Sequence, residues 1–361
     1  MTEVFGASAP VFKVGAEVRG ELARDLSRLE IDEATDGLKT LSLHLVAEGP
    51  KDNAEEEEQL YLDGQIVDLG KELEVSIGPS DGARIVFKGL ISGLEAIFSE
   101  GGEPYVVLYA EDKLMKLRMT RRMKTYENKT DAQIAEAIAD EHHIDAEAAV
   151  EGPKYKVVQQ WNQSDLAFLR DRGRLVQAEV WLQDEKLHFK TRGHRNGTEV
   201  TLIQGNDLID VQLRADLAHQ RTKVKVSGYD AKERDTIDEE ADSDTIRAEI
   251  SGGRTGPKIL KDTFNERVSY RVRENPLVSG EAKAWAKAEM LRRCRSFVTV
   301  VGTTTGTPDM VVGSRLTLDR VGAPFNGDGY YVTRLRHTYD LTSGHRTRFE
   351  AERATVNETN T

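Results

Sequence analysis

The sequence predicts a mainly β protein with an α/β module inserted between two β regions. Apolar and polar residues alternate repeatedly in residues 1–124 and again in residues 201–361, which is the pattern of half-buried strands. Residues 125–200 instead carry two helix-like segments among short strands. A chain of 361 residues is long enough for two or three separate cores. We therefore expect a first β domain at 1–124, an α/β module at 125–200 and a second β domain at 201–361.

The first region is expected to form a series of strands. LSRLEI (26–31) and LKTLSLHLVA (38–47) place apolar residues at alternate positions on either side of the turn-like DEATDG. QIVDLGKELEVSIG and ARIVFKGLISGLEAIF continue this pattern, and PYVVLYAEDKLMKLRM passes from a strand to a short helix. The acidic run KDNAEEEEQL (51–60) has nothing to bury, so we expect a loop there.

Two helix starts mark the middle region. Thr130 precedes DAQIAEAIADEH and can accept hydrogen bonds from unpaired amides of the first turn. In QWNQSDLAFLRDRG (160–173), either Asn162 or Ser164 can be the N-cap, and Asp165 suits the positive end of the helix dipole. KYKVVQQ is the expected strand before this helix, and AEVWL, QDEK and LHFK indicate a hairpin after it.

The last region is strand-like except for two segments. DLIDVQLRADL and RTKVKVSGYD are expected strands, and the chain finishes in turn-rich β sequence. Residues 233–258 are acidic, poorly hydrophobic and contain Gly-Gly, which indicates a long exposed loop. SGEAKAWAKAEMLRRC (279–294) favours a helix with Ser279 as its N-cap.

The two ends of the chain share a pattern. LGKELEV, which contains Gly70, lines up with VGSRLTL, which contains Gly313, and a long strand, a turn and another strand follow both. The separation of Gly70 from Gly313 is within one residue of the separation of Gly102 from Gly344. This similarity is explained equally well by a duplicated β domain and by a chance match between two β sequences.

Charge and cysteine content exclude several classes of protein. The formal net charge is −12, and the densest basic run, KLRMTRRMK (116–124), fits a solvated helix face or strand edge, so we expect no nucleic-acid binding. Cys294 is the only cysteine, so no intrachain disulfide can form. The N-terminus has no secretory signal, and no stretch has the roughly 18 apolar residues that span a membrane. We expect cytoplasmic synthesis and no membrane insertion.

No group of residues predicts catalysis. His142 and His143 would point about 100° apart on a helix and so would rarely share a metal ion. The ADSD stretch (241–244) lacks the glycine and terminal glutamate of a calcium loop. Cys294 lies between arginines, which could lower its pKa, but the sequence identifies no partner histidine. We expect neither an enzyme nor a cofactor or metal site.

The run NQSDLAFLRDRGRLVQAEVWLQDEKLHFK and the tail GYYVTRLRHTYDLTSGHRTRFEAER carry a family resemblance. Together they resemble the phage late control protein D family, the tail-hub proteins of contractile phages and related injection systems, which are similar to the hub part of VgrG spikes. The resemblance extends from VFKVGAEV to the final AER. Its fold markers in this chain are Trp161, Asp165, Phe168, Leu169, Gly313, Gly329, Tyr330, Tyr331 and His337.

The resemblance implies two tube-like β-barrel domains per chain and three chains that form a ring of six barrels. Such a homotrimer has pseudo-sixfold symmetry, so it can join a sixfold tail tube to a trimeric spike. The sequence ends after AERATVNETNT without a spike-like segment, so the spike is expected to be a separate protein. The implied partners are thus other copies of the chain, the tail tube protein, the spike protein and other baseplate proteins. Together they would form a phage or phage-tail-like particle assembled in a bacterium.

Two other classes of function stay open. A tail-associated cell-wall hydrolase could use carboxylates such as Asp165 or Glu179, although nothing in the sequence places them together. A monomeric receptor- or effector-binding module could use the acidic segments 51–60 and 233–258 as its contact surface.

Overall fold

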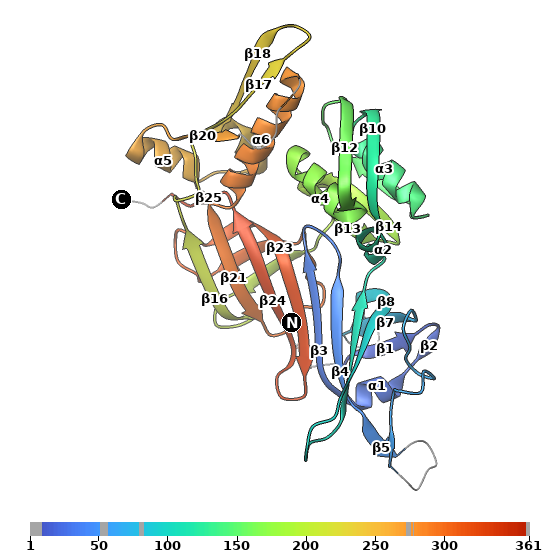
Figure 1. The fold of residues 1–361 in the computed structure, drawn as a ribbon. Coiled ribbons are helices and arrows are strands. Elements are labelled where there is room, and N and C mark those ends of the chain that lie inside the picture. The colour runs from blue at the N-terminus through green and yellow to red at the C-terminus, as the bar shows by residue number, and fades with distance from the viewer. Residues whose placement is uncertain (1–8, 51–56, 79–82, 272–275, 277, 359–361) are drawn as a thin grey trace.

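The computed structural model describes residues 9–50, 57–78, 83–271, 276 and 278–358. Strands hold 48% of the residues and helices 21%, so the prediction of a mainly β protein is confirmed. Most strands belong to one 13-stranded sheet with the order β16-β21-β24-β23-β3-β4-β9-β8-β7-β1-β2. Off this path, β22 pairs with β23, and β15 pairs with β22. Figure 1 shows this sheet crossing the lower part of the molecule, where blue and teal strands lie beside red ones.

The first half of the sheet comes from the N-terminal region. Its strands bury alternate residues, as the sequence predicts, and Phe12, Leu29, Leu43 and Leu73 are fully enclosed in its core. Its elements are β1 (Val11–Val14), β2 (Glu17–Val18), α1 (Gly20–Arg24), β3 (Leu26–Ala34), β4 (Thr40–Val46), β7 (Glu72–Ile77), β8 (Arg84–Ile97) and β9 (Tyr105–Glu111).

A small hairpin lies beside this half, formed by β5 (Glu48–Pro50) and β6 (Glu57–Gln59). Of the loop expected at 51–60, residues 51–56 lie outside the described part of the chain, and residues 57–59 form β6.

The second half of the sheet repeats the first. Its elements are β15 (Glu199–Ile203), β16 (Leu208–Ala215), β21 (Val298–Thr304), β22 (Arg315–Asp319), β23 (Gly327–Asp340) and β24 (Gly344–Arg353). The spatial order β3-β4-β9-β8-β7-β1 of the first half matches β16-β21-β24-β23-β22-β15 of the second, and the strands follow each other along the chain in the same sequence in both halves. One difference is that β1 runs antiparallel to β7 whereas β15 runs parallel to β22. This shared strand order favours a duplicated β domain over a chance match between two β sequences.

The strand order is an open path within the described residues, and neither half closes on itself there. The two halves are instead joined edge to edge, because β23 pairs with β3. Strands from the two ends of the chain therefore form one continuous surface.

The α/β module connects β9 to β15. It begins with α2 (Met115–Met119) and contains two small sheets, β10-β12 and β11-β14-β13, with α3 and α4 packed against them. Thr130 caps α3 in a capping box with Gln133, and Ser164 caps α4 by accepting from the amide of Ala167, so both predicted helix starts are confirmed. Its other elements are β10 (Arg121–Lys129), α3 (Asp131–Glu141), β11 (Ala146–Ala149), β12 (Tyr155–Ser164), α4 (Asp165–Val176), β13 (Ala178–Gln183), β14 (Lys186–Thr191) and a 3-10 turn at Arg192–His194.

A second insertion separates β16 from β21. Its elements are β17 (Lys223–Asp230), β18 (Asp235–Asp242), a 3-10 helix at Ser243–Glu249, β19 (Arg254–Thr255), α5 (Gly256–Phe264), β20 (Val268–Arg271) and α6 (Ser279–Arg295), and β19 pairs with the C-terminal β25 (Thr355–Val356). Trp285 of α6 shares a core with Phe168 of α4, so this insertion packs against the α/β module. In Figure 1 both insertions lie above the sheet.

Two predictions about this insertion are wrong. Residues 233–258 are not a long loop, because β18 pairs with β17 and buries Ile237, and the following 3-10 helix buries Ile246. Ile237 and Ile246 are buried although most of their neighbours in this segment are charged, and they anchor it to the rest of the protein. Helix α6 exists, but its N-cap position is Val278, and the hydroxyl of Ser279 donates to the carboxylate of Glu239 instead.

Candidate assembly interface

The two halves of the sheet meet at what we call the internal seam, the pairing of β23 with β3. It runs antiparallel from Arg334 opposite Ala34 to Asp340 opposite Arg28. Only the C-terminal part of β23 takes part, because its N-terminal part pairs with β22. Antiparallel strand pairing within the chain thus joins the two halves of the sheet.

Side chains close the internal seam on both faces. Leu335 and Tyr339 of β23 are only 2% and 9% exposed, and Tyr339 packs into the core of the first half. On the other face, the Asp32 carboxylate accepts from Nε of Arg336 at 3.0 Å and from a guanidinium nitrogen of Arg334 at 3.5 Å. Apolar burial on one face and a cross-strand ion pair on the other stabilise the pairing.

Two of the strand edges that lack a strand partner among the described residues carry exposed apolar side chains. One, the β8 edge, is the side of residues 93–98 that faces away from β9; the other, the β16 edge, is the side of β16 that faces away from β21. Leu94 and Phe98 on the β8 edge are 38% and 60% exposed. Ile209 on the β16 edge is also exposed. Unpaired edges with exposed apolar side chains are the surfaces that other chains pair with.

A buried ion-pair cluster, which we call the junction, holds the α/β module on the sheet. Arg195, only 4% exposed, donates to Glu33 of β3 at 2.8 Å and to Glu179 of β13 at 3.2 Å. The hydroxyl of Tyr331 in β23 donates to Glu179 at 2.7 Å. Burial acts to raise the pKa of Glu33, but Lys39 and Arg195 outweigh it and the pKa lies below its ordinary value. The junction therefore connects both halves and the module through paired charges.

The predicted marker Tyr331 lies in this junction rather than in an apolar core. Guanidinium groups of Arg192 and Arg315 lie over its ring at 4.2 and 4.3 Å from the centroid. Burial, with the Glu179 carboxylate, raises the pKa of the Tyr331 hydroxyl, which stays protonated as a donor. Tyr330 is also fully buried, and its hydroxyl donates to the carbonyl of Phe325 at 2.6 Å.

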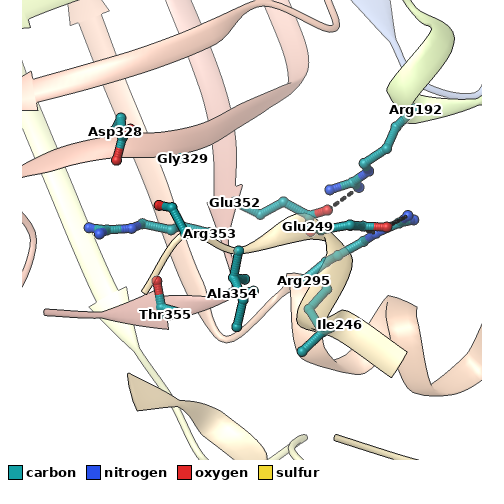
Figure 2. A pocket seen from close by; sticks show the side chains of 12 residues that line it. Arg192, Ile246, Glu249, Arg295, Asp328, Gly329, Glu352, Arg353, Ala354 and Thr355 are labelled. Carbon is teal, nitrogen blue, oxygen red and sulfur yellow. Dashed lines mark hydrogen bonds and ion pairs between the residues drawn. The ribbon is translucent and has the colours of Figure 1, made fainter. Parts of the chain in front are cut away.

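A cavity of about 70 Å³ lies next to the junction. Figure 2 shows Arg192 reaching the carboxylate of Glu352 and Arg295 lying against Glu249. Burial acts to raise the pKa of Glu249, but Arg295 outweighs it and the pKa is lowered. Each of these carboxylates faces a guanidinium, so the cavity is lined by structural ion pairs.

Asp165 is the buried centre of the α/β module. Its carboxylate is fully enclosed and contacts Nε of Arg122 at 2.9 Å, Nε2 of His142 at 2.8 Å and Nε2 of Gln160 at 2.8 Å. Asp165 therefore does more than complement the helix dipole, since it joins β10, α3, β12 and α4. The contact with Asp165 buries the ring of His142 at the end of α3, whereas His143 is exposed.

The other markers within residues 160–173 have separate roles. Phe168 is buried and stacks on Tyr126 with 5.7 Å between centroids, and Leu169 is fully buried. Trp161 is 64% exposed on β12 and belongs to no core. Phe168 and Leu169 thus stabilise the module, whereas Trp161 presents an indole to its surroundings.

His337 belongs to a buried polar pair in the second half. Its Nδ1 lies 3.1 Å from Nε2 of His345 and 3.1 Å from the hydroxyl of Thr347. Burial, and then the neighbouring ring, lower the pKa of His337 well below its ordinary value. Burial also lowers the pKa of His345 to about 4. Both rings are neutral near pH 7 and act as hydrogen-bonding parts of the core.

Two glycine markers have positive φ, Gly313 in a turn before β22 and Gly329 near the start of β23. Gly313 has a φ of +94°, and a Cβ there would lie 2.9 Å from Cγ of Arg195. Gly329 has a φ of +88° and directly precedes the buried tyrosines. Both positions favour glycine because other residues rarely adopt this conformation.

The remaining catalytic candidates are not brought together. Asp165 and Glu179 have different polar partners, and burial raises the pKa of the Cys294 thiol to about 12. No three His, Cys, Asp or Glu side chains could hold a metal ion within the part of the chain that the structure describes. Among those residues there is also no helix long and apolar enough to cross a bilayer.

Sequence reasoning missed the junction and the two open edges. Glu33, Arg192, Arg195 and Glu352 are ordinary charged residues in the sequence. The contacts of Arg195 with Glu33 and of Arg192 with Glu352 link positions more than a hundred residues apart. No local pattern marks such a contact. The open edges could have been found only by combining the duplicated pattern with the strand pairing.

A family model described as the Alg8 N-terminal domain matches residues 24–340, from the end of α1 to the end of β23. The chain belongs to this family. The Alg8 N-terminal domain match covers both insertions and most of both halves of the sheet, and leaves out β1 and β2 at one end and β24 and β25 at the other. A comparison with curated proteins finds no match.

Solved phage tail proteins share the fold of this Alg8 N-terminal domain family member. The 43 kDa tail protein of prophage MuSo2 from Shewanella oneidensis aligns with a TM-score of 0.68 and 14% identity over 96% of this chain and 98% of that chain. The tail protein from Neisseria meningitidis MC58 aligns with a TM-score of 0.64 and 15% identity over 96% and 97% of the two chains.

The Escherichia coli c3393 protein aligns with a TM-score of 0.59 and 14% identity over 97% of this chain and 79% of that chain. It is described as a component of the type VI secretion system with structural similarity to the T4 bacteriophage tail proteins gp27 and gp5. Identities this low show that the fold is shared.

Proposed function

We propose that the chain is a structural hub protein of a contractile phage tail or a phage-tail-like injection system, of the late control protein D type. The observation that carries the proposal is the duplicated half-sheet, which is joined through β3 and β23 and leaves the corresponding edges of β16 and β8 without a strand partner among the described residues. The tail proteins that share the fold support this role and are consistent with a non-enzymatic function.

Duplication suits a hub because of symmetry. Three copies of a chain with two equivalent halves present six similar elements around a threefold axis. Such a ring can contact a sixfold tail tube on one face and a trimeric spike on the other. In this assembly the halves of neighbouring chains would complete the tube-like barrels that a single chain leaves open.

The partners follow from this role. They are two further copies of the chain, the tail tube protein, a separate spike protein and other baseplate proteins, in a particle assembled in the bacterial cytoplasm. The β domains at 1–124 and 201–361 would form the ring wall, and the α/β module at 125–200 would stand on it. The paired, buried charges of the junction would keep the module fixed under load.

Reconstitution tests this proposal. The purified chain is mixed with the tail-tube and spike proteins of the same particle, and complexes are imaged by electron microscopy. We expect one layer of the chain between tube and spike. Failure to bind either protein would contradict the proposal, and clearing of peptidoglycan by the purified chain in a zymogram would favour the cell-wall hydrolase instead.

A further inference from the structure

We propose that the β8 edge of one copy pairs with the β16 edge of another copy, in the register of the internal seam. Gly93 would lie opposite Asp216 and Ser99 opposite Asp210, with the strands antiparallel. The inference deepens the proposed hub function by naming the residues that join its copies. It depends on that function only for the number of copies in the ring.

The first step is the equivalence of β8 and β23. Each strand bulges at one residue where it pairs with the following strand, β8 at Ser92 and β23 at Thr333. The Ser92 hydroxyl donates to the carbonyl of Tyr109 at 3.4 Å, and the Thr333 hydroxyl donates to the carbonyl of Glu350 at 3.2 Å. These matching bulges align β8 with β23 residue by residue, so that the free part of β8 corresponds to the part of β23 that pairs with β3.

The second step is the equivalence of β3 and β16. Leu26 of β3 and Leu208 of β16 are both buried at the start of a strand pair, and each precedes a bulged residue. The bulged residues are Ser27 in β3 and Ile209 in β16. The free edge of β16 therefore corresponds to the edge of β3 that the internal seam uses.

Together the two alignments give a register between copies, and its charges are complementary. In the internal seam Arg336 lies opposite Asp32 and donates to it at 3.0 Å. The equivalent residues between copies are Glu95 and Arg214, so opposite charges again face each other with their signs exchanged. Arg214 is 70% exposed and pairs only with nearby Asp216 in the isolated chain, so it is accessible to a second copy.

The apolar residues of the two edges also match the internal seam. Leu94 and Phe98 are exposed, whereas their equivalents Leu335 and Tyr339 are buried by the pairing with β3. On the partner strand, Val211 and Leu213 are only partly buried, whereas their equivalents Leu29 and Ile31 are enclosed. Phe98 would then pack into the core of the second half of the next copy, as Tyr339 packs into the core of the first half within the chain.

This pairing is head to tail. Each copy offers one β8 edge and one β16 edge, so every contact uses unlike surfaces and the chain of contacts must close into a ring or continue as a filament. A ring of three copies would alternate internal seams with equivalent seams between copies. All the half-sheets would then form one continuous wall with no exposed strand edge at these positions.

Disulfide cross-linking tests the register. Ile97 would lie opposite Gln212, a pair equivalent to Thr338 and Glu30 of the internal seam. An Ile97→Cys/Gln212→Cys variant should form intermolecular disulfides on mild oxidation, because directly opposed strand positions bring the Cβ atoms within bonding range. Native Cys294 is buried and gives no background. The matched control is Ile97→Cys/Leu213→Cys, whose second cysteine lies one position away and faces the opposite side of the sheet.

We expect dimers and trimers of cross-linked chains from the first variant and monomers from the control. No cross-link at any protein concentration, or equal cross-linking of the control, overturns the proposed pairing. If the Ile97→Cys/Gln212→Cys variant forms a trimer in solution but no intermolecular disulfide on oxidation, the register is overturned and the hub function still stands. A cross-linked ring that binds neither the tube protein nor the spike protein would support the register and contradict the hub function.

A charge exchange provides a second measurement. Glu95→Arg and Arg214→Glu each place like charges opposite each other at every seam between copies, and should weaken self-association about tenfold or more over a ring. The double variant Glu95→Arg/Arg214→Glu restores opposite charges, with the same polarity as Arg336 and Asp32. The double variant should recover the native strength of self-association. If it associates no more strongly than the single variants, the register is overturned.

Discussion

Gly70 and Gly313 hold the same place in the two halves of the sheet. Their φ angles are +82° and +94°, and their amides donate to the carbonyls of Ile91 at 2.8 Å and Val332 at 2.9 Å. The surroundings differ, because a Cβ on Gly70 would meet no atom within 4 Å, whereas one on Gly313 would approach Cγ of Arg195 to 2.9 Å. Duplication has thus kept the backbone while the second copy gained a contact with the junction.

This difference gives a matched pair of substitutions. Gly70→Ala should lower the free energy of unfolding by about 1–2 kcal/mol, the cost of a left-handed conformation in a residue with a Cβ. Gly313→Ala should lower it further, by about 1–3 kcal/mol, because Arg195 must also move. Urea unfolding of both variants measures the difference, and equal losses would contradict the assigned contact.

Removing Arg195 should be strongly destabilising. Arg195→Met leaves Glu33 and Glu179 without their shared guanidinium in a buried site, which costs about 3–5 kcal/mol. Arg174→Met, at an exposed ion pair with Asp171, serves as the control and should cost less than about 1 kcal/mol. Similar denaturant midpoints for the two variants would show that the junction does not hold the module on the sheet.

Asp165 offers a test of the α/β module. Asp165→Asn removes the charge that Arg122 contacts inside the module, and should lower the free energy of unfolding by about 2–3 kcal/mol. Asp171→Asn changes an exposed carboxylate of the same helix and should have a small effect. Thermal unfolding by circular dichroism compares the two, and an unaffected Asp165→Asn protein would contradict the central position of this carboxylate.

The buried histidine pair should make stability depend on pH. Because the folded-state pKa values of His337 and His345 lie below 6.5, the unfolded chain binds protons there that the folded chain does not. Their contribution is complete above about pH 6.5 and is lost towards pH 4, by up to about 1.4 kcal/mol per pH unit for each ring. Asp112, whose pKa burial raises to about 6, acts in the opposite direction but equally in every variant compared.

A histidine substitution isolates this effect. His345→Gln should reduce the pH dependence of the free energy of unfolding between pH 6.5 and 5. The control His219→Gln alters an exposed ring and should keep the native slope. An unchanged slope in the His345→Gln protein would contradict the neutral buried pair.

Local signals in the sequence predicted local structure well. Thr130 and Ser164 cap their helices because the groups that they satisfy lie within three residues along the chain. The β strands followed from alternation, and the shared pattern around Gly70 and Gly313 indicated the duplication. The acidic segment 233–258 was misjudged, because Ile237 and Ile246 are too few to create a visible period yet are buried by a partner strand and α6.

Long-range contacts could not be predicted in this way. The pairing of β3 with β23 joins residues about three hundred positions apart, and Arg195 meets Glu33 across 162 positions. Such contacts depend on how the sheet is ordered, which no short motif records. The exposed state of Phe98 is likewise a consequence of the strand order, since its alternating pattern resembles that of buried neighbours.

The native mass of the purified chain tests the central claim most directly. Light scattering across a concentration series should show a rise from the 40.3 kDa of one chain to a plateau near that of three chains, about 121 kDa. The plateau is the decisive feature, because a head-to-tail contact that closes must stop growing at the ring. A mass that stays at 40.3 kDa at every concentration, or that grows without a plateau, would contradict a closed trimeric hub.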